Sequence, residues 1–350
     1  MITPQTYTLA LLVCLCGILG WGFWAATIRM GGPKWRFELY YFDFSIGALL
    51  LTTLVAFTLG SMGSDITFMD NLAIIRKQQI GVAMLAGGVI NLGNILLTAA
   101  IVLMGMSAAF PVAMGLALPI ALLSGSLGDT GSRGVLWAAI ALMLAAAALA
   151  ARAFKHFHEQ KEIAQLQKAS AAGGKQKPAP RPSPWKGVAL AAVGGLFVGG
   201  AFPLMNLARV GDIEMAPYPI AFFMTLGLFL TTFVYNIFLT NLPVEGAPIS
   251  VFRYFKGTLK QHGAGIVGGA AWAVGLVAVL TIAALPPSAA LSPALRISLP
   301  PLATLLAAFC GLLAWGEFRD AGDRAAVLIR LSLFVFLLGA SVAAVAGLLG

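Results

Sequence analysis

Long apolar runs separated by short polar segments make up most of this chain of 350 residues. A helix that crosses the hydrocarbon core of a bilayer needs about 20 mostly apolar residues. Ten runs meet that requirement, and we expect helices at residues 6–28, 39–60, 79–103, 107–127, 134–152, 186–208, 215–239, 262–285, 290–315 and 325–348. Because irregular backbone is not tolerated in lipid, the pattern predicts an all-α integral membrane protein with ten transmembrane helices.

One apolar stretch occurs twice. Residues 87–119 align without a gap to residues 268–300, so that a Gly-Gly pair, a Ser-Ala-Ala sequence and a Leu-Pro sequence match in the same order. Internal duplication in a hydrophobic chain is typical of secondary transporters. Each copy has five predicted helices, an odd number, so the second copy inserts upside down relative to the first. We expect two inverted five-helix repeats.

The repeats are expected at residues 1–152 and 186–350, with a cytoplasmic loop or linker at 153–185. Residues 153–167 extend the fifth predicted helix, whereas residues 168–184 are rich in Pro, Gly and Lys and cannot build a core. A phosphate-binding loop is not expected there, because Ala169 and Gln176 stand where that motif needs Gly and Ser or Thr.

Composition and charge fit this picture. The chain is 59% hydrophobic and 10% charged, and its mean hydropathy is +0.91, which a soluble domain of this length cannot hide in a core. The net charge is +9, and most Lys and Arg lie in alternate loops, as expected on the cytoplasmic side. We expect a multi-pass protein of the cell (inner) membrane, with both termini outside and no nucleic-acid partner.

Polar side chains inside membrane helices cost free energy and are therefore candidates for a binding site. Asn91 and Asn94 lie three residues apart, on one face of the third predicted helix. Their amides offer donors and acceptors, which suits an uncharged polar ligand. Two interpretations stay open: the pair binds substrate, or it joins neighbouring helices. Trp272 aligns with Asn91 in the second copy, and its ring offers a stacking face.

Three further residues are substrate-binding candidates. Trp24 in the first predicted helix either lines a cavity or belongs to an interfacial aromatic belt. Asn206 lies in the corresponding part of the sixth predicted helix. Arg296, in the ninth, binds an anionic or carbonyl group of the substrate, pairs with a carboxylate, or extends to the outer surface.

Acidic residues are few in the predicted helices. Glu38 and Asp43 lie at the start of the second, and Asp43 is roughly 6 Å inside it at 1.5 Å per residue. A desolvated carboxylate at this depth is a candidate carrier of a coupling proton. The alternative is that Asp43 caps the helix or pairs with Arg29 or Arg36.

Prolines inside the fourth and ninth predicted helices are hinge candidates, because each removes a helix hydrogen bond: Pro111, Pro119 and Pro300. Proline is also common in membrane helices generally. The three cysteines have no metal-ligand spacing, and no clustered His, Cys or carboxylate set is available for chemistry. We therefore expect no metal, no cofactor and no enzymatic activity.

Several stretches resemble a known family. LSGSLGD at 123–129 and LLAWGEFRDAGDR at 312–324 are similar to the helix ends of the drug/metabolite transporter superfamily. YFDFSI at 41–46, GGVINLGN at 87–94 and WGEFR at 315–319 resemble its ureide permease branch and the neighbouring rhamnose-proton symporters and glucose uptake proteins. The resemblance implies a proton-coupled uptake carrier with both termini outside and a long central cytoplasmic loop.

These observations predict a secondary active transporter of a small polar metabolite, such as a sugar, a ureide or a nucleobase-like compound. Its partners would be the lipid bilayer, the small-molecule substrate and a proton, or alternatively Na⁺. Two alternatives stay open: a metabolite or drug exporter of the same superfamily, and a membrane receptor or assembly subunit without transport.

Overall fold

The computed structural model describes residues 1–63, 66–127, 131–171 and 183–349. In this part of the chain, ten helical segments are long and apolar enough to cross a membrane. They are Tyr7–Met30, Phe37–Phe57 (α3), Lys77–Met104 (α5), Met106–Leu123 (α6), Arg133–Lys168 (within α7, Arg133–Ala171), Pro184–Arg209 (α8), Pro217–Asn241 (α9), Leu259–Ala283 (α10), Pro293–Ala314 and Asp323–Leu348 (α12). The expected all-α architecture with ten candidate membrane helices is confirmed.

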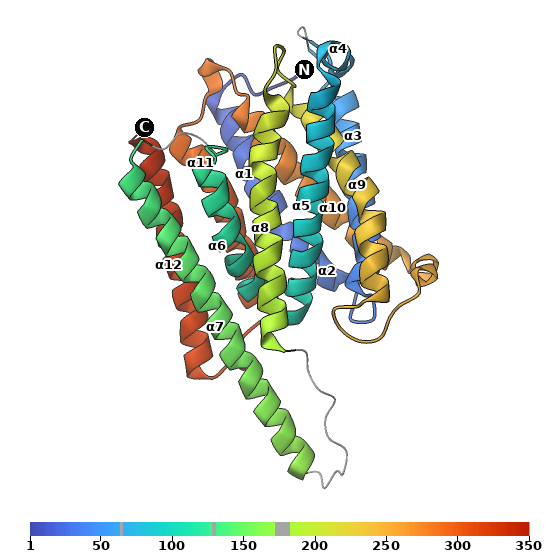
Figure 1. Cartoon of the computed structure of the whole chain (residues 1–350), viewed down its shortest axis with the longest axis vertical. Helices are drawn as coiled ribbons and strands as arrows, with labels where there is room; N and C mark the ends of the chain where they lie inside the picture. Colours follow the sequence, from blue (N-terminus) through green and yellow to red (C-terminus); the bar gives the residue numbers. More distant parts are fainter. Residues whose placement is uncertain (64–65, 128–130, 172–182, 350) are drawn as a thin grey trace.

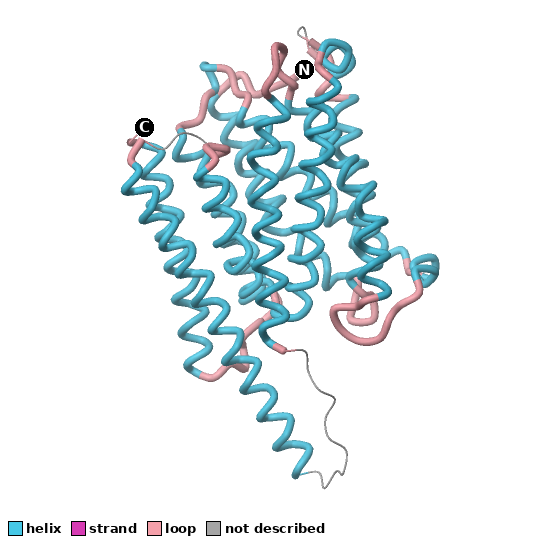
Figure 2. The backbone as a smooth tube through the Cα atoms, viewed as in Figure 1, coloured by secondary structure: helices cyan, strands magenta, loops and turns pink. Residues whose placement is uncertain are grey.

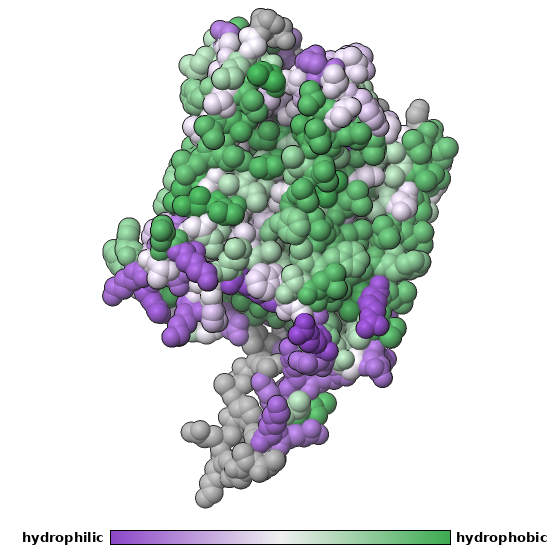
Figure 3. All heavy atoms as spheres, turned by 180° about the vertical axis from the view of Figure 1, so that it is seen from behind, coloured by the Kyte–Doolittle hydropathy of each residue, from purple (hydrophilic) through white to green (hydrophobic). Residues whose placement is uncertain are grey.

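The ten segments run side by side in one bundle (Figure 1). Both termini lie at one end of the bundle, and the connections between helices alternate between the two ends (Figure 2). Strongly hydrophilic side chains gather at the end opposite the termini, below a broad apolar belt (Figure 3). They include the basic residues of the loop after α2 (Thr27–Met30) and of the 3₁₀ helix Val251–Lys256. We call the two ends the terminal end and the charged end. The apolar belt is the surface that a bilayer would cover.

Two membrane segments are irregular. The first consists of α1 (Tyr7–Phe23), a 3₁₀ turn at Trp24–Ala26 and the short helix α2 (Thr27–Met30). The ninth consists of α11 (Pro293–Phe309) followed by a π-helical turn at Cys310–Ala314. Such turns interrupt the regular backbone hydrogen bonds and are often found at functional positions. Neither interruption was predicted from the apolar pattern.

Helix boundaries differ from the prediction at several other places. The fifth predicted helix, 134–152, continues as α7 to Ala171, as proposed for residues 153–167. The fourth ends at Leu123 instead of 127, and a short surface helix, α4 (Phe68–Ile74), precedes α5. Most of the linker expected at 168–184 lies outside the described residues.

The helix contacts come in matching pairs. Helix α1 packs against α10 as α8 packs against α5, and α3 packs against α10 as α9 packs against α5. Likewise, α1 contacts α11 as α8 contacts α6, and α6 contacts α7 as α11 contacts α12. The remaining major contacts join α3 to α9, α6 to α11 and α7 to α12. Exchanging the first five membrane segments with the last five leaves this contact pattern unchanged.

Glycines mark the closest matching contacts. Gly87 on α5 lies against the backbone carbonyl of Met224 on α9, and Gly269 on α10 lies against that of Phe44 on α3. By these contacts the counterpart of Gly87 is Gly269, one residue away from the sequence alignment. The Ser-Ala-Ala sequences are also not equivalent, because Ser107 lies in the first turn of α6 whereas Ser288 lies in a short 3₁₀ turn before α11.

Candidate functional site

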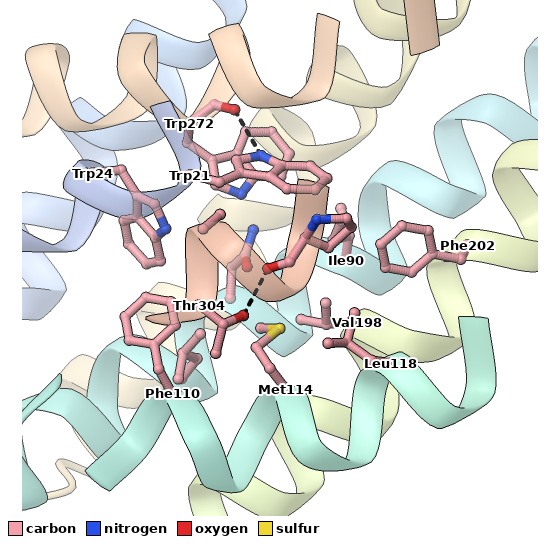
Figure 4. Close-up of a pocket in the computed structure, with 14 residues that line it drawn as sticks. Trp21, Trp24, Ile90, Phe110, Met114, Leu118, Val198, Phe202, Trp272 and Thr304 are labelled. Carbon is pink, nitrogen blue, oxygen red and sulfur yellow. Dashed lines mark hydrogen bonds between the residues drawn. The ribbon is translucent and has the colours of Figure 1, made fainter. Parts of the chain in front are cut away.

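A cavity lies between helices from both halves of the chain (Figure 4). Its volume is about 40 Å³, which is room for a few water molecules. The lining residues come from α1 and the turn after it, α5, α6, α8, α10 and α11, and they are Trp21, Trp24, Ile90, Asn94, Leu97, Phe110, Met114, Leu118, Val198, Phe202, Trp272, Pro300, Ala303 and Thr304. We call this space the central cavity.

Aromatic rings form much of the wall. The indole Nε1 of Trp21 donates a hydrogen bond of 3.0 Å to the carbonyl of Trp272, which joins α1 to α10. Trp24 is buried, and its ring lies 6.2 Å from that of Phe110. Phe202 closes another side, 6.5 Å from Trp21 in an edge-to-face arrangement. Of the two interpretations of Trp24, the structure supports a position in a cavity wall.

Asn94 is the polar group that stands out in this wall. It is buried, and its Nδ2 has no hydrogen-bond partner among the described residues. An unpaired buried donor costs about 1–3 kcal/mol, which the protein recovers if a ligand accepts the bond. The nearby hydroxyl of Thr304 donates to the carbonyl of Pro300 at 2.9 Å and still offers an acceptor to the cavity.

Asn91 has a different environment although it lies on the same helix. Its Nδ2 donates to the carbonyl of Leu228 and to the hydroxyl of Thr231, both at 2.9 Å, and to Thr232 at 3.1 Å. Its Oδ1 accepts from the hydroxyl of Tyr41 at 3.0 Å. The side chain therefore joins α5 to α3 and α9. The structure does not bring Asn91 into the central cavity.

Asn206 and Arg296 lie together toward the terminal end. Both line a small cavity of about 30 Å³ and an adjoining surface cavity of about 420 Å³, with Ser126 and Arg209 also shared by the two. We call these two spaces the vestibule. Phe202 lines both the inner part of the vestibule and the central cavity. Its ring therefore separates the central cavity from the terminal end.

At the charged end, Glu317 joins three segments. Its carboxylate accepts a hydrogen bond of 2.6 Å from Arg29, which lies in α2 at the end of the broken first segment. It also accepts from the backbone N–H groups of Met106 and Ser107 at 3.1 and 2.9 Å, and from the Ser107 hydroxyl at 2.7 Å. A carboxylate is stabilised at the N-terminus of α6 by the helix dipole. These contacts close the bundle at this end.

Asp43 lies on α3 near the charged end and is buried. Its carboxylate accepts a hydrogen bond of 2.6 Å from the hydroxyl of Tyr254 and lies 2.9 Å from Nδ1 of His262 on α10. Arg29 and Arg36, considered as its partners, bind Glu317 and Glu38 instead. His262 and Tyr254 were not predicted, because nothing in a sequence places residues more than 200 positions away beside Asp43.

Glu38 is fully buried in the first turn of α3. Arg36 Nε donates to it at 3.1 Å, and the Arg36 guanidinium also donates to the carbonyl of Ala247 at 2.8 Å. Asn236 on α9 donates to the Glu38 backbone carbonyl. Glu38 therefore has the surroundings of a structural ion pair, which differ from those of Asp43.

The three hinge candidates are buried in their helices, Pro111 and Pro119 in α6 and Pro300 in α11. Only Pro300 lines the central cavity. Trp21 and Thr304 also line it and were not among the candidates. Among the described residues, no group of three or more His, Cys, Asp or Glu side chains is placed to hold a metal ion.

A bundle of ten apolar helices around an internal cavity defines a multi-pass membrane protein. Comparison with family models gives no match, and comparison with curated proteins gives none either. A solved structure described only as "Crystal structure of protein" is similar in fold, with a TM-score of 0.50 and 16% identity over 97% of this chain and 98% of that one. This likeness concerns the fold alone.

Proposed function

We propose that this protein is an alternating-access secondary transporter that takes up a small, uncharged polar metabolite, such as a sugar, a ureide or a nucleobase-like compound. The central cavity is its substrate site. The protein lies in the cell (inner) membrane, with the charged end facing the cytoplasm. Residue resemblances at 41–46, 87–94 and 315–319 favour membership of the drug/metabolite transporter superfamily. Transport, rather than chemistry, is the activity of the site.

The paired helix contacts support two inverted five-helix repeats. Every major contact between membrane segments either has a counterpart in the other half or joins equivalent helices, as α3 joins α9. The glycine contacts of Gly87 and Gly269 obey the same exchange. Inverted repeats allow one half to rock against the other around a site at their interface. The central cavity lies at that interface, since its wall comes from both halves.

The unpaired Nδ2 of Asn94 is the observation that carries this proposal. A donor without a partner, surrounded by Trp24, Phe202 and Trp272, suits a ligand that has an acceptor atom and a flat or apolar face. The central cavity is smaller than a metabolite in this conformation. Substrate therefore enters in a wider state, which the break in the first helix and the proline in α11 permit.

Proton coupling is assigned to Asp43, because this carboxylate is buried beside a histidine at a helix interface. Protonation drives transport only if it stabilises one facing state more than the other. The contact of Asp43 on α3 with His262 on α10 lies between helices of the two proposed repeats. It is therefore placed to bias their relative position. Coupling to Na⁺ is the alternative.

A ligand screen followed by flux measurement tests this function. The purified full-length protein is screened by thermal shift against sugars, ureides and nucleobases, and the compound that stabilises it is followed into proteoliposomes. We expect Asn94→Leu to abolish both the thermal shift and uptake. Binding without flux into wild-type vesicles would instead favour a receptor. Transport that is unaffected by Asn94→Leu would place the substrate elsewhere.

Orientation is tested separately by labelling from outside the cell. Gln5→Cys and Ser250→Cys lie at the terminal and charged ends, and both positions are exposed. In a variant lacking the native cysteines, we expect a membrane-impermeant maleimide to label Gln5→Cys and to leave Ser250→Cys unmodified. The reverse pattern would invert the proposed topology.

A further inference from the structure

Residues 251–260 form an exposed segment at the charged end. It consists of a 3₁₀ helix, Val251–Lys256, and the start of α10. Figure 1 shows it beside the lower part of α9, standing out sideways from the bundle. A segment in this position meets the edge of the bilayer, where acyl chains give way to headgroups.

The outer side of this segment is strongly apolar. Phe252 and Phe255 are each 77% exposed, and Leu259 is 89% exposed. Exposing three large apolar side chains to water is unfavourable, and the two phenylalanine rings suit the interfacial layer of a membrane. The segment is therefore built to insert these side chains among lipids.

Basic residues alternate with the apolar ones. Arg253, Lys256 and Lys260 are exposed, and none of them has an ion-pair partner among the described residues. The sequence contains no Asp or Glu between Glu245 and Glu317. The exposed side of the segment thus has three basic side chains and no acidic one, which complements negatively charged headgroups and not neutral ones.

The segment also has an inward side. Tyr254 points the opposite way from its neighbours, since its hydroxyl donates to Asp43 at 2.6 Å and its ring lies 4.7 Å from that of His262. Anchoring of the outer side chains in lipid would therefore hold Tyr254 against the buried carboxylate.

We propose that residues 251–260 bind anionic phospholipid of the leaflet at the charged end, with the two phenylalanines inserted and the three basic side chains on headgroups. The binding does not depend on what the central cavity transports.

The role of the basic side chains is tested by native mass spectrometry, which detects the lipids that stay bound to the protein. The full-length protein is extracted from nanodiscs of mixed phosphatidylcholine and phosphatidylglycerol. We expect Arg253→Gln/Lys256→Gln to lower phosphatidylglycerol affinity roughly twenty-five-fold, since each basic residue near an anionic surface contributes about fivefold. Retention of phosphatidylcholine should not change. The matched control Arg324→Gln/Arg330→Gln removes two exposed charges from the first three turns of α12, at the same end but next to the acidic Asp323, and should behave as wild type.

A second variant tests whether the two exposed phenylalanines insert into the bilayer. Phe252→Ser/Phe255→Ser should also lower phosphatidylglycerol retention, whereas Tyr254→Phe should not, because it removes only the inward hydroxyl. All altered side chains except Tyr254 are exposed, so thermal unfolding should stay near wild type. Equal phosphatidylglycerol retention in the charge variant and its control would overturn the proposal. So would a serine variant that keeps its lipid but loses a dimer, since a second copy would then cover the segment.

Discussion

Asn91 and Asn94 lie three residues apart on α5 and differ in what their amides contact. Asn91 makes hydrogen bonds to two other helices, and Asn94 lines the central cavity with an Nδ2 that has no partner among the described residues. The amide of Asn91 therefore joins helices, whereas the amide of Asn94 is available to a ligand. Stability should depend on the first and ligand binding on the second.

Leucine at each position separates these roles. Asn91→Leu should lower the free energy of unfolding by about 2 kcal/mol, since an interhelical hydrogen bond in a membrane protein contributes roughly 0.6 kcal/mol and the two N–H donors and the oxygen of this amide make three of them. Asn94→Leu should leave stability unchanged or slightly higher, because it removes an unsatisfied donor. Thermal unfolding in one detergent compares both variants with wild type. Equal destabilisation would show that Asn94 is also structural.

Asp43 carries the second prediction at this scale. Asp43→Asn keeps the shape of the side chain and an acceptor for Tyr254, but it removes the charge beside His262. We expect proteoliposomes with this variant to lose accumulation driven by a pH gradient and to keep exchange of labelled for unlabelled substrate. Accumulation at the wild-type level would exclude Asp43 as the coupling group.

Tyr254 provides a control for the loss of a hydrogen bond alone. Burial, and next its hydrogen bond to Asp43, raise the pKa of Tyr254. The hydroxyl therefore stays protonated and donating throughout the neutral range, and it is not itself a titrating group there. Tyr254→Phe should alter the pH at which uptake is half-maximal without abolishing gradient-driven accumulation.

The sequence alone identified these residues as candidates, but it did not identify the residues that contact them. The helical spacing of Asn91 and Asn94 was readable, because it depends on neighbours along one helix. Their partners were not, because Leu228 is 137 positions from Asn91. The same holds for Asp43, whose partner His262 is 219 positions away. Polarity inside an apolar run identifies a residue as unusual, and only the packing shows which unusual residue has its hydrogen bonds satisfied.

At the scale of helices, the length and apolar content of each run were sufficient to predict where the membrane helices lie. The predicted span 79–103 is observed as Lys77–Met104, because membrane thickness and backbone hydrogen bonding leave few alternatives. The 3₁₀ turn at Trp24–Ala26 and the π turn at Cys310–Ala314 were missed, since their sequences are as apolar as the helices around them. In the first of these turns Trp24 contacts Phe110 of α6, a long-range contact that the apolar pattern does not contain.

Close helix contacts give the prediction at this scale. A Cβ on Gly87 would collide with the Met224 carbonyl, whereas a Cβ on Gly81 of the same helix meets nothing within 4 Å. Gly87→Ala should therefore destabilise the protein by about 1–3 kcal/mol through overpacking. Gly81→Ala should stabilise it by about 0.5–1 kcal/mol through helix propensity. Gly269→Ala and Gly263→Ala form the equivalent pair on α10. Unequal behaviour of the two pairs would argue against equivalent repeats.

At the scale of the whole molecule, different contacts close the central cavity toward its two ends. At the charged end, Glu317 ties Arg29 to the start of α6. Toward the terminal end, the ring of Phe202 separates the central cavity from an open vestibule. In the proposed carrier, the Glu317 contacts close the charged end, and in alternating access they must break for substrate to leave there.

Glu317→Gln should therefore favour the opposite state. Hydrogen bonds to a charged group contribute about 1.5–3 kcal/mol, so their weakening should shift the population roughly tenfold or more toward opening at the charged end. The reporter is Ala303→Cys in the wall of the central cavity, in a chain without its native cysteines. We expect an impermeant maleimide to label it about tenfold faster from the charged end and more slowly from the terminal end.

The control is Glu245→Gln, which alters an exposed carboxylate at the same end and should have no effect. Faster labelling from both ends would mean that the variant loosens the bundle instead of switching it, and unchanged labelling would show that Glu317 does not hold this end closed.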